Sequence, residues 1–207
     1  MNVNFKKGYR FNLFTWKELE TLINIRPLMT NQRVIFPVPV PRFEWKNSGW
    51  ALAQDCWPAT ILQELIEERI FYIKDISQFT EDLNDFAKNL EEEYNGDVDA
   101  HIYVCRNPAI EHPFQIHYDR SDNVIVQCEG VTNFKVWEEV KDPNHEFHHL
   151  EMDSSPILDV DMKPGDAIWI PKSYPHSATS NTPRMSVSFP FMGNGNEFIQ
   201  NRDWIQL

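Results

Sequence analysis

The sequence predicts a mainly β protein in which N-terminal helices support a double-sheet jelly roll. Three observations lead to this class: helical periodicity is concentrated before about residue 99, short strand-like runs dominate after it, and turn residues divide those runs. At 207 residues and 42% hydrophobic, the chain is long enough to fill one core. We therefore expect a single domain over 1–207, with helical support and an arm in 1–98, the jelly-roll core in 99–192 and a tail in 193–207.

Amphipathic helices are expected in the first part of the chain. Thr15 followed by Glu18 has the spacing of a capping box, and the residues after it place apolar side chains on one face. Pro58 opens a second helix, and a third ends at Asn95-Gly96. The expected elements are helices after Thr15, after Pro58 and over 83–94, and strands over 33–36 and 70–75.

Short β-branched and aromatic runs follow from residue 99. They cover 100–105, 114–117, 124–128, 132–137, 167–170 and 185–189. Many short strands behind a helical portion are typical of two packed sheets, which here predicts a double-stranded β-helix of the cupin, or jelly-roll, type.

Residues 37–58 are unusual because aromatic side chains lie among prolines. Phe43, Trp45, Trp50 and Trp57 all fall in this segment. Two interpretations stay open. The arm covers the barrel exterior, or it forms a lid or wall of the substrate pocket.

The strongest chemical signal is His117-Tyr118-Asp119, followed 57 residues after Asp119 by His176. In a β-strand, residues i and i+2 share a face, so His117 and Asp119 are expected to converge while Tyr118 points away. A turn and short strand over 161–171 should bring His176 beside them. Two histidines and one carboxylate leave other metal positions open, a donor set typical of non-haem Fe(II) oxygenases.

The remaining histidines give weaker signals. His145, His148 and His149 lie in a polar stretch that favours a solvated loop over a second metal site, and His101 and His112 lack a partner pattern.

Charge and cysteine content limit the partners and the compartment. The formal net charge is −12, and residues 64–99 hold 12 acidic residues against three basic ones. This run is either a solvated helical face or a surface that attracts a cationic peptide. No Lys/Arg stripe is visible, which argues against a nucleic-acid partner.

Cys56, Cys105 and Cys128 show no metal-type spacing. With neither an apolar leader nor a membrane-length run, we expect a soluble, cytoplasmic protein; whether it forms a homodimer stays open.

Several blocks together resemble the JmjC-type, cupin-like 2-oxoglutarate-dependent oxygenases, and within them the bacterial ribosomal-oxygenase (cupin-4) group. The resemblance runs from about residue 97 to 191. It depends on 100–105, on His117-Tyr118-Asp119 with Asn123, on 124–130, on 163–171 leading to His176, and on 187–191.

The resemblance implies Fe(II) held by His117, Asp119 and His176, with 2-oxoglutarate as cosubstrate and O2 as oxidant. It implies hydroxylation of a carbon of a peptide or protein side chain or of a small amino-acid-like substrate, with release of succinate and CO2. Related halogenases lack the carboxylate, so Asp119 favours hydroxylation. The alternatives are a cupin-type metal-dependent isomerase or lyase, in which more histidines are usual, and a non-catalytic metal- or ligand-binding cupin.

One departure from the family concerns the cosubstrate. Relatives place a Lys or Arg two residues after the glycine that matches Gly130, and this chain has Thr132 there. Arg184 is the expected replacement, because strand alternation puts it on one face with Ser186 and Ser188. Lys135 competes, although its parity relative to Thr132 should turn it outward. The resemblance places Asn123 near the metal-binding end of 2-oxoglutarate, and Ser186 and Thr132 complete the expected contacts.

Overall fold

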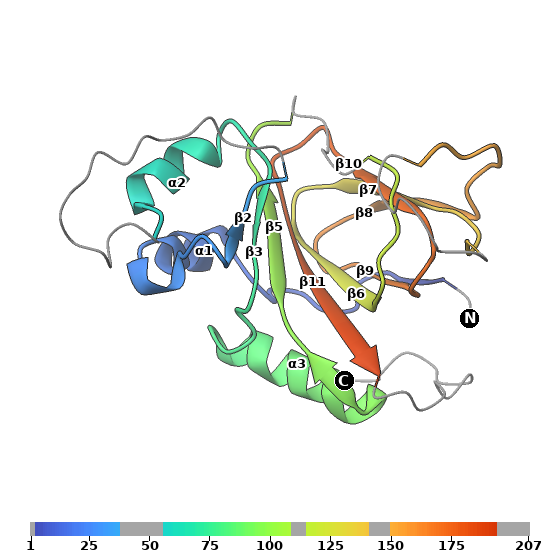
Figure 1. Ribbon diagram of the computed structural model, residues 1–207, viewed down its shortest axis with the longest axis horizontal. Helices are drawn as coiled ribbons and strands as arrows, with labels where there is room; N and C mark the ends of the chain where they lie inside the picture. The colour runs from blue at the N-terminus through green and yellow to red at the C-terminus, as the bar shows by residue number, and fades with distance from the viewer. Residues whose placement is uncertain (1–2, 38–55, 109–114, 141–149, 194–207) are drawn as a thin grey trace.

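A computed structural model describes residues 3–37, 56–108, 115–140 and 150–193 (Figure 1). Its described helices are α1 (Trp16–Ile23), α2 (Ala59–Leu65) and α3 (Glu81–Tyr94), with a 3-10 turn η1 (Arg26–Leu28). Its described strands are β1 (Asn4–Lys6), β2 (Val34–Ile35), β3 (Phe71–Ile73), β4 (Gly96–Val98), β5 (His101–Cys105), β6 (Asp122–Glu129), β7 (Thr132–Val136), β8 (Leu158–Met162), β9 (Ala167–Ile170), β10 (His176–Thr179) and β11 (Arg184–Gly193).

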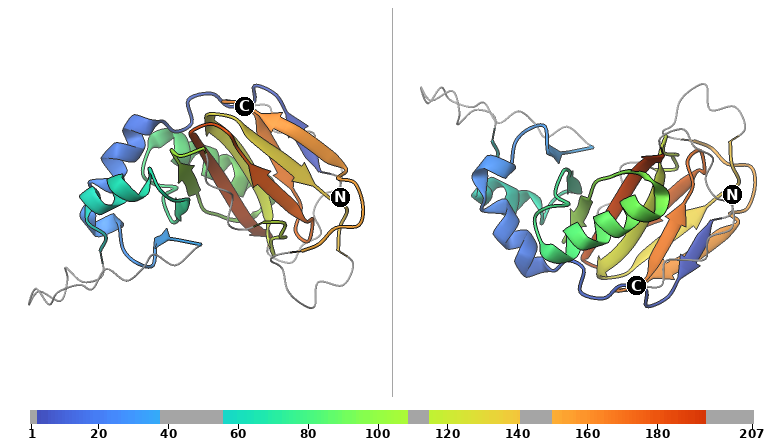
Figure 2. Two further views of the ribbon diagram at one scale, coloured as in Figure 1. Left: turned by 90° about the horizontal axis from the view of Figure 1, so that it is seen from above. Right: turned by 90° about the horizontal axis from the view of Figure 1, so that it is seen from below.

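The strands form two antiparallel sheets, which confirms the predicted fold class. The larger sheet has the order β1-β9-β6-β11-β5-β3-β2, and β4 pairs with the far end of β11. The smaller sheet has the order β10-β7-β8. Strands far apart in sequence are therefore neighbours, as two facing sheets of a jelly roll require. Figure 2 shows the smaller sheet lying against one side of the larger one.

The larger sheet buries side chains on both faces. Val124 and Val126 of β6 belong to the core that contains the helices, whereas Ile125 packs with Phe134 and Val136 of the smaller sheet. Helices thus cover one face and the smaller sheet covers the other. A central strand buried on both faces explains why the three successive residues Val124, Ile125 and Val126 of β6 are all apolar instead of alternating with polar ones.

The helix signals of the sequence are confirmed. The Thr15 hydroxyl accepts from the Glu18 amide at 3.3 Å, and the Glu18 carboxylate accepts from the Thr15 amide at 2.7 Å, so both halves of the capping box form at α1. At the end of α3, Asn95 takes the left-handed conformation with φ 49°, and Gly96 already begins β4.

One predicted strand is wrong. The segment expected as a strand over 114–117 has an irregular backbone from residue 115 and forms only an isolated bridge between His117 and His176. Gln115 has φ 48°, a left-handed conformation that interrupts an extended chain.

Four strands were not predicted. They are β1, β4, β8 and β10. Strands β1 to β4 bring the part of the chain before residue 99 into the larger sheet.

Other expectations fall partly outside the described residues. Most of the aromatic arm does so, as do His112, His145, His148 and His149. At the described end of this arm, Trp57 packs against Phe36 with ring centroids 5.0 Å apart.

The three cysteines are free thiols. Within the described ranges, no helix combines the length and the apolar character that crossing a membrane needs.

Candidate metal centre

The structure brings His117, Asp119 and His176 together. Each offers one donor atom, and these atoms all lie within 4.8 Å of one another. The His176 Nε2 lies 3.7 Å from Asp119 Oδ2, and the two imidazole centroids are 4.4 Å apart. Two imidazoles and one carboxylate at this spacing can hold a divalent transition metal while leaving coordination positions open.

Backbone hydrogen bonds set the separation of the two histidines. The His117 amide donates to the His176 carbonyl at 3.0 Å, and the His176 amide donates to the His117 carbonyl at 2.7 Å. The Ser173 amide donates to the Asp119 carbonyl at 2.9 Å, which anchors the same segment two residues further on. The ligand segment is irregular, but it is tied at both ligand positions to the chain that leads into β10.

Both imidazoles have one nitrogen turned to a carbonyl. His117 Nδ1 lies 3.3 Å from the Gln115 carbonyl, and His176 Nδ1 lies 3.0 Å from the Tyr174 carbonyl. A carbonyl only accepts, so Nδ1 carries the proton in each ring and Nε2 is left as the electron-pair donor. Such hydrogen bonds from Nδ1 orient both imidazoles for a metal.

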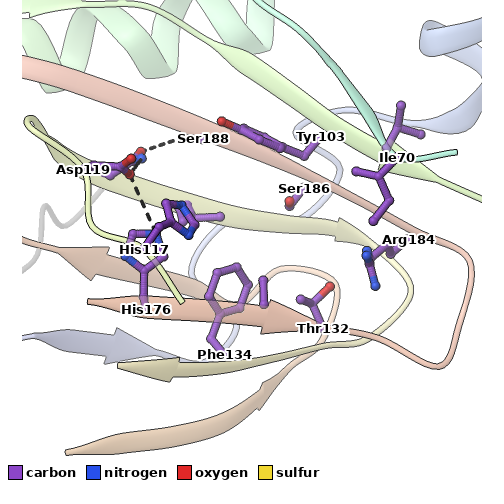
Figure 3. A pocket seen from close by; sticks show the side chains of 14 residues that line it. Ile70, Tyr103, His117, Asp119, Thr132, Phe134, His176, Arg184, Ser186 and Ser188 are labelled. Carbon is purple, nitrogen blue, oxygen red and sulfur yellow. Dashed lines mark hydrogen bonds and ion pairs between the residues drawn. The ribbon is translucent and has the colours of Figure 1, made fainter. Parts of the chain in front are cut away.

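A pocket between the two sheets extends from these three residues. Figure 3 shows the triad at one end and Arg184 with Thr132 at the other. Strands β5, β6 and β11 of the larger sheet contribute Tyr103, Asn123, Ile125, Arg184, Ser186 and Ser188, and the smaller sheet contributes Thr132, Phe134, His176 and Ala178.

Arg184 is a buried cation without a counter-ion in the described part of the chain. Only 7% of it is exposed, its Nη2 has no hydrogen-bond partner there, and burial lowers the pKa of its guanidinium. Thr132 lies at the same end of the pocket but on the smaller sheet, and its Oγ1 is likewise buried and without a partner among the described residues. Two orphaned donors in one pocket fit a carboxylate, because leaving such groups unpaired costs free energy.

The alternation expected along β11 is present. Arg184, Ser186 and Ser188 all line the pocket. The register between β11 and β6 shifts between Met185 and Ser186, but the extra residue lies on β6, so β11 keeps its alternation.

Lys135 has the outward orientation that its parity predicts. Its ammonium lies 3.5 Å from Asp159 Oδ2, and its side chain is 44% exposed, on the far side of the smaller sheet from the pocket. Lys135 is therefore not placed to meet a ligand in the pocket.

Two polar residues of the pocket were not predicted as site residues from the sequence. Tyr103 was not singled out at all, and Ser188 was placed only on the face of Arg184; they line the pocket from β5 and β11. Burial, and then the charge of Asp119, raise the pKa of the Tyr103 phenol, so it stays a neutral hydrogen-bond donor. Because Tyr103 alternates with the core residues Ile102 and Val104 along β5, strand periodicity alone could have indicated it.

A second cluster involves His101, for which no partner pattern was visible in the sequence. Its Nε2 lies 3.0 Å from Asp99 Oδ2, and Asp75 completes the group. Burial favours a higher pKa for Asp99, but hydrogen bonds with His101 and Asp75 outweigh it and lower the pKa to about 2. These groups pair with one another near the surface, so the cluster needs no further ligand.

The fold and the donor set together define a class: a cupin-type double-stranded β-helix with a His/Asp/His centre between its sheets. Comparison with known protein families supports this class, because the family model of the JmjC domain matches residues 76–197. The chain belongs to the JmjC domain family, whose members use Fe(II), 2-oxoglutarate and O2.

Solved structures with this fold include the ribosomal oxygenase YcfD of Escherichia coli. Its complex with cobalt and 2-oxoglutarate has a TM-score of 0.61 at 16% identity, over 94% of this chain and 49% of YcfD. Its complex with cobalt and succinic acid has a TM-score of 0.59 at 17% identity, with the same shares of both chains. At such identity the likeness shows the fold.

A curated relative is the bifunctional lysine-specific demethylase and histidyl-hydroxylase NO66 of Drosophila persimilis. It is 27% identical over 105 residues, which are 49% of this chain and 15% of NO66. The chain therefore corresponds to about half of YcfD and to a small part of NO66.

Proposed function

We propose that this protein is a Fe(II)- and 2-oxoglutarate-dependent dioxygenase that hydroxylates a carbon of a peptide or protein side chain or of a small amino-acid-like molecule. The observation that carries the proposal is one pocket with two complementary ends. His117, Asp119 and His176 converge at the first, and an unpaired buried guanidinium lies at the second.

The first end suits iron. Neutral imidazole nitrogens and one carboxylate are the donors of the facial triad, and three protein ligands leave positions for a chelating cosubstrate and oxygen. With both Nδ1 atoms turned to carbonyls, His117 and His176 need no rearrangement to present Nε2. The residues therefore fit the metal that the family uses.

The second end suits a carboxylate at the distal end of 2-oxoglutarate. Arg184 supplies charge from β11 and Thr132 supplies a hydroxyl from β7, so a carboxylate between the sheets would satisfy both orphaned donors. This chain thus carries the cation on the opposite sheet from the position where relatives have it. Ser186, between Arg184 and Ser188, is a further donor on the same wall.

Bound iron would couple the oxidative decarboxylation of 2-oxoglutarate, which yields succinate and CO2, to oxygen insertion into a C–H bond. The protein residues bind, orient and exclude water. Ile70, Ile125 and Phe134 give the pocket apolar walls, and the neutral Tyr103 phenol adds a donor near the metal end. Such walls limit water around reactive groups.

A protein side chain is the preferred target within this proposal. The names of YcfD, a ribosomal oxygenase, and of NO66, a histidyl-hydroxylase, support a protein substrate for this chain. The name of YcfD also supports a cytoplasmic setting. The acidic run over 64–99 supports a cationic partner, because opposite charge steers association.

The experiment begins with the purified protein, Fe(II) and 2-oxoglutarate under air and under argon. We expect succinate only with oxygen, and, from a peptide or lysate substrate, a product heavier by one oxygen atom. His117→Ala should abolish both, while Lys135→Met serves as a matched control outside the pocket. An isomerase, a lyase or a non-catalytic binder would form no oxygen-dependent succinate, and that result would reject the proposal.

A further inference from the structure

Asp119 differs from the two histidines in how its side chain is held. The imidazoles are oriented by backbone carbonyls, whereas the Asp119 carboxylate accepts a hydrogen bond from the side chain of Asn123, at 3.1 Å from Nδ2 to Oδ2. The accepting oxygen is also the one 3.7 Å from His176 Nε2, so it faces the metal centre. Within the described ranges, Asn123 is the one side chain that donates to this carboxylate.

Asn123 is in turn held by a buried hydroxyl. Ser188 Oγ donates to Asn123 Oδ1 at 2.6 Å. Ser188 is 2% exposed and Asn123 is 6% exposed, so water does not compete freely for either group. Asn123 lies opposite Pro190 on the paired strands β6 and β11, and Ser188 is two residues before Pro190 on the same face.

The direction of this chain of hydrogen bonds is determined by chemistry. An ionised carboxylate only accepts, so the amide nitrogen of Asn123 must face Asp119. The amide oxygen then faces Ser188, where only the hydroxyl can donate. A reversed amide would place its oxygen against the carboxylate, which is repulsive. The Asp119 carboxylate thereby selects the amide orientation, and the Ser188 hydroxyl holds the amide in it by donating to Oδ1.

The support matters because Asp119 lies outside regular secondary structure. Its segment has an isolated bridge at His117 instead of a strand ladder, and its side chain is 35% exposed. A short, partly exposed carboxylate on such a segment has other rotamers available. An oriented donor restricts them before metal arrives.

We propose that Ser188 and Asn123 are positioning residues that hold the Asp119 carboxylate toward the metal centre. The proposal rests on the proposed function, since it requires a metal at the triad. It also gives Asn123 a role different from the cosubstrate contact expected from the sequence: one amide hydrogen and the amide oxygen are used within the protein. Removing a residue that hydrogen-bonds to a metal ligand typically weakens metal binding by about 10–100-fold.

The test measures Co(II) affinity of the whole chain by competition with a chromophoric chelator, without any turnover. Ser188→Thr keeps the hydroxyl and Ser188→Val replaces it by a methyl group of equal size, so effects of size on stability cancel between the two variants. We expect Ser188→Thr to bind Co(II) like the wild type and Ser188→Val to bind about 3–10-fold more weakly, as loss of one buried hydrogen bond implies. Asn123→Ala should weaken binding by about 10–100-fold.

A double-mutant cycle completes the test. In the Asn123→Ala background the hydroxyl has no amide to orient, so the difference in Co(II) affinity between Ser188→Thr and Ser188→Val should vanish. Equal Co(II) affinity of the two variants in the otherwise wild-type chain would overturn the positioning role and leave the proposed function intact. A difference that persists without Asn123 would also overturn it. Failure of the wild type to bind Co(II) would reject the proposed function, and the positioning role with it.

Discussion

Replacement of Arg184 by methionine should have opposite effects on cosubstrate binding and on the stability of the ligand-free fold. The guanidinium is 7% exposed and has an unpaired Nη2 among the described residues, so it is costly in the empty pocket and valuable once a carboxylate is bound. Methionine has similar length and no charge. A structural arginine would show the same sign in both measurements, so the pair of measurements is diagnostic.

The magnitudes follow from burial. Removing one partner of a buried ion pair costs about 3–5 kcal/mol, and 3 kcal/mol corresponds to roughly a 150-fold increase in the Kd for 2-oxoglutarate. Removing the unpaired charge from the empty pocket should instead stabilise the fold by about 1 kcal/mol, or about 2–4 °C in Tm for a chain of this size.

Calorimetric titration of 2-oxoglutarate into the Mn(II)-loaded protein gives the first quantity, and thermal unfolding of the metal-free protein gives the second. Lys135→Met is the control, because it removes a cation that points away from the pocket. Unchanged affinity in Arg184→Met, or a Tm several degrees below that of the wild type, would refute the assignment. Moving the cation extends the test: Thr132→Arg combined with Arg184→Ser should recover at least about tenfold of the affinity that Arg184→Ser alone loses, since both positions face one pocket.

Three further predictions concern the fold. Thr15→Ala removes the capping box of α1 and should cost about 1 kcal/mol, seen as a Tm lower by about 2–4 °C; an unchanged Tm would contradict it. Gly130→Ala should cost at least about 3 kcal/mol in urea unfolding, because φ is +68° and an added Cβ would overlap the Pro183 carbonyl oxygen; near-wild-type stability would show that the turn can relax. Burial raises the pKa of the Cys128 thiol from 9.0 to about 12. The contribution of the protonated thiol to the free energy of unfolding is therefore complete below the pKa of the unfolded chain and is lost as the pH rises toward 12. Between about pH 8 and pH 10 the Tm of Cys128→Ala should therefore fall less than that of the wild type, and parallel falls would argue against a raised pKa of this partly buried thiol.

The sequence predicted the parts of the site that depend on local geometry. Alternation along a strand put Arg184, Ser186 and Ser188 on one face and turned Lys135 outward, because that periodicity needs no knowledge of neighbours. Strand alternation did not apply at His117, because the left-handed conformation of Gln115 interrupts the expected strand. No local sequence signal indicates that conformation.

What the sequence could not predict depends on pairing between distant segments. Strand β10 begins at His176 and has few β-favouring residues, so its extended form comes from pairing with β7. The contact of Ser188 with Asn123 requires the register between β11 and β6, which one sequence does not specify. The acidic cluster around His101 likewise joins the ends of β3 and β5.

The fate of labelled oxygen tests most directly whether this protein is a dioxygenase. With Fe(II), 2-oxoglutarate, the unmodified form of an identified target and ¹⁸O2, we expect one labelled atom in succinate and one in the product. The His176→Ala variant, which lacks a triad ligand, should yield neither. Unlabelled succinate and product, or product formed without oxygen, would contradict a dioxygenase centred on His117, Asp119 and His176.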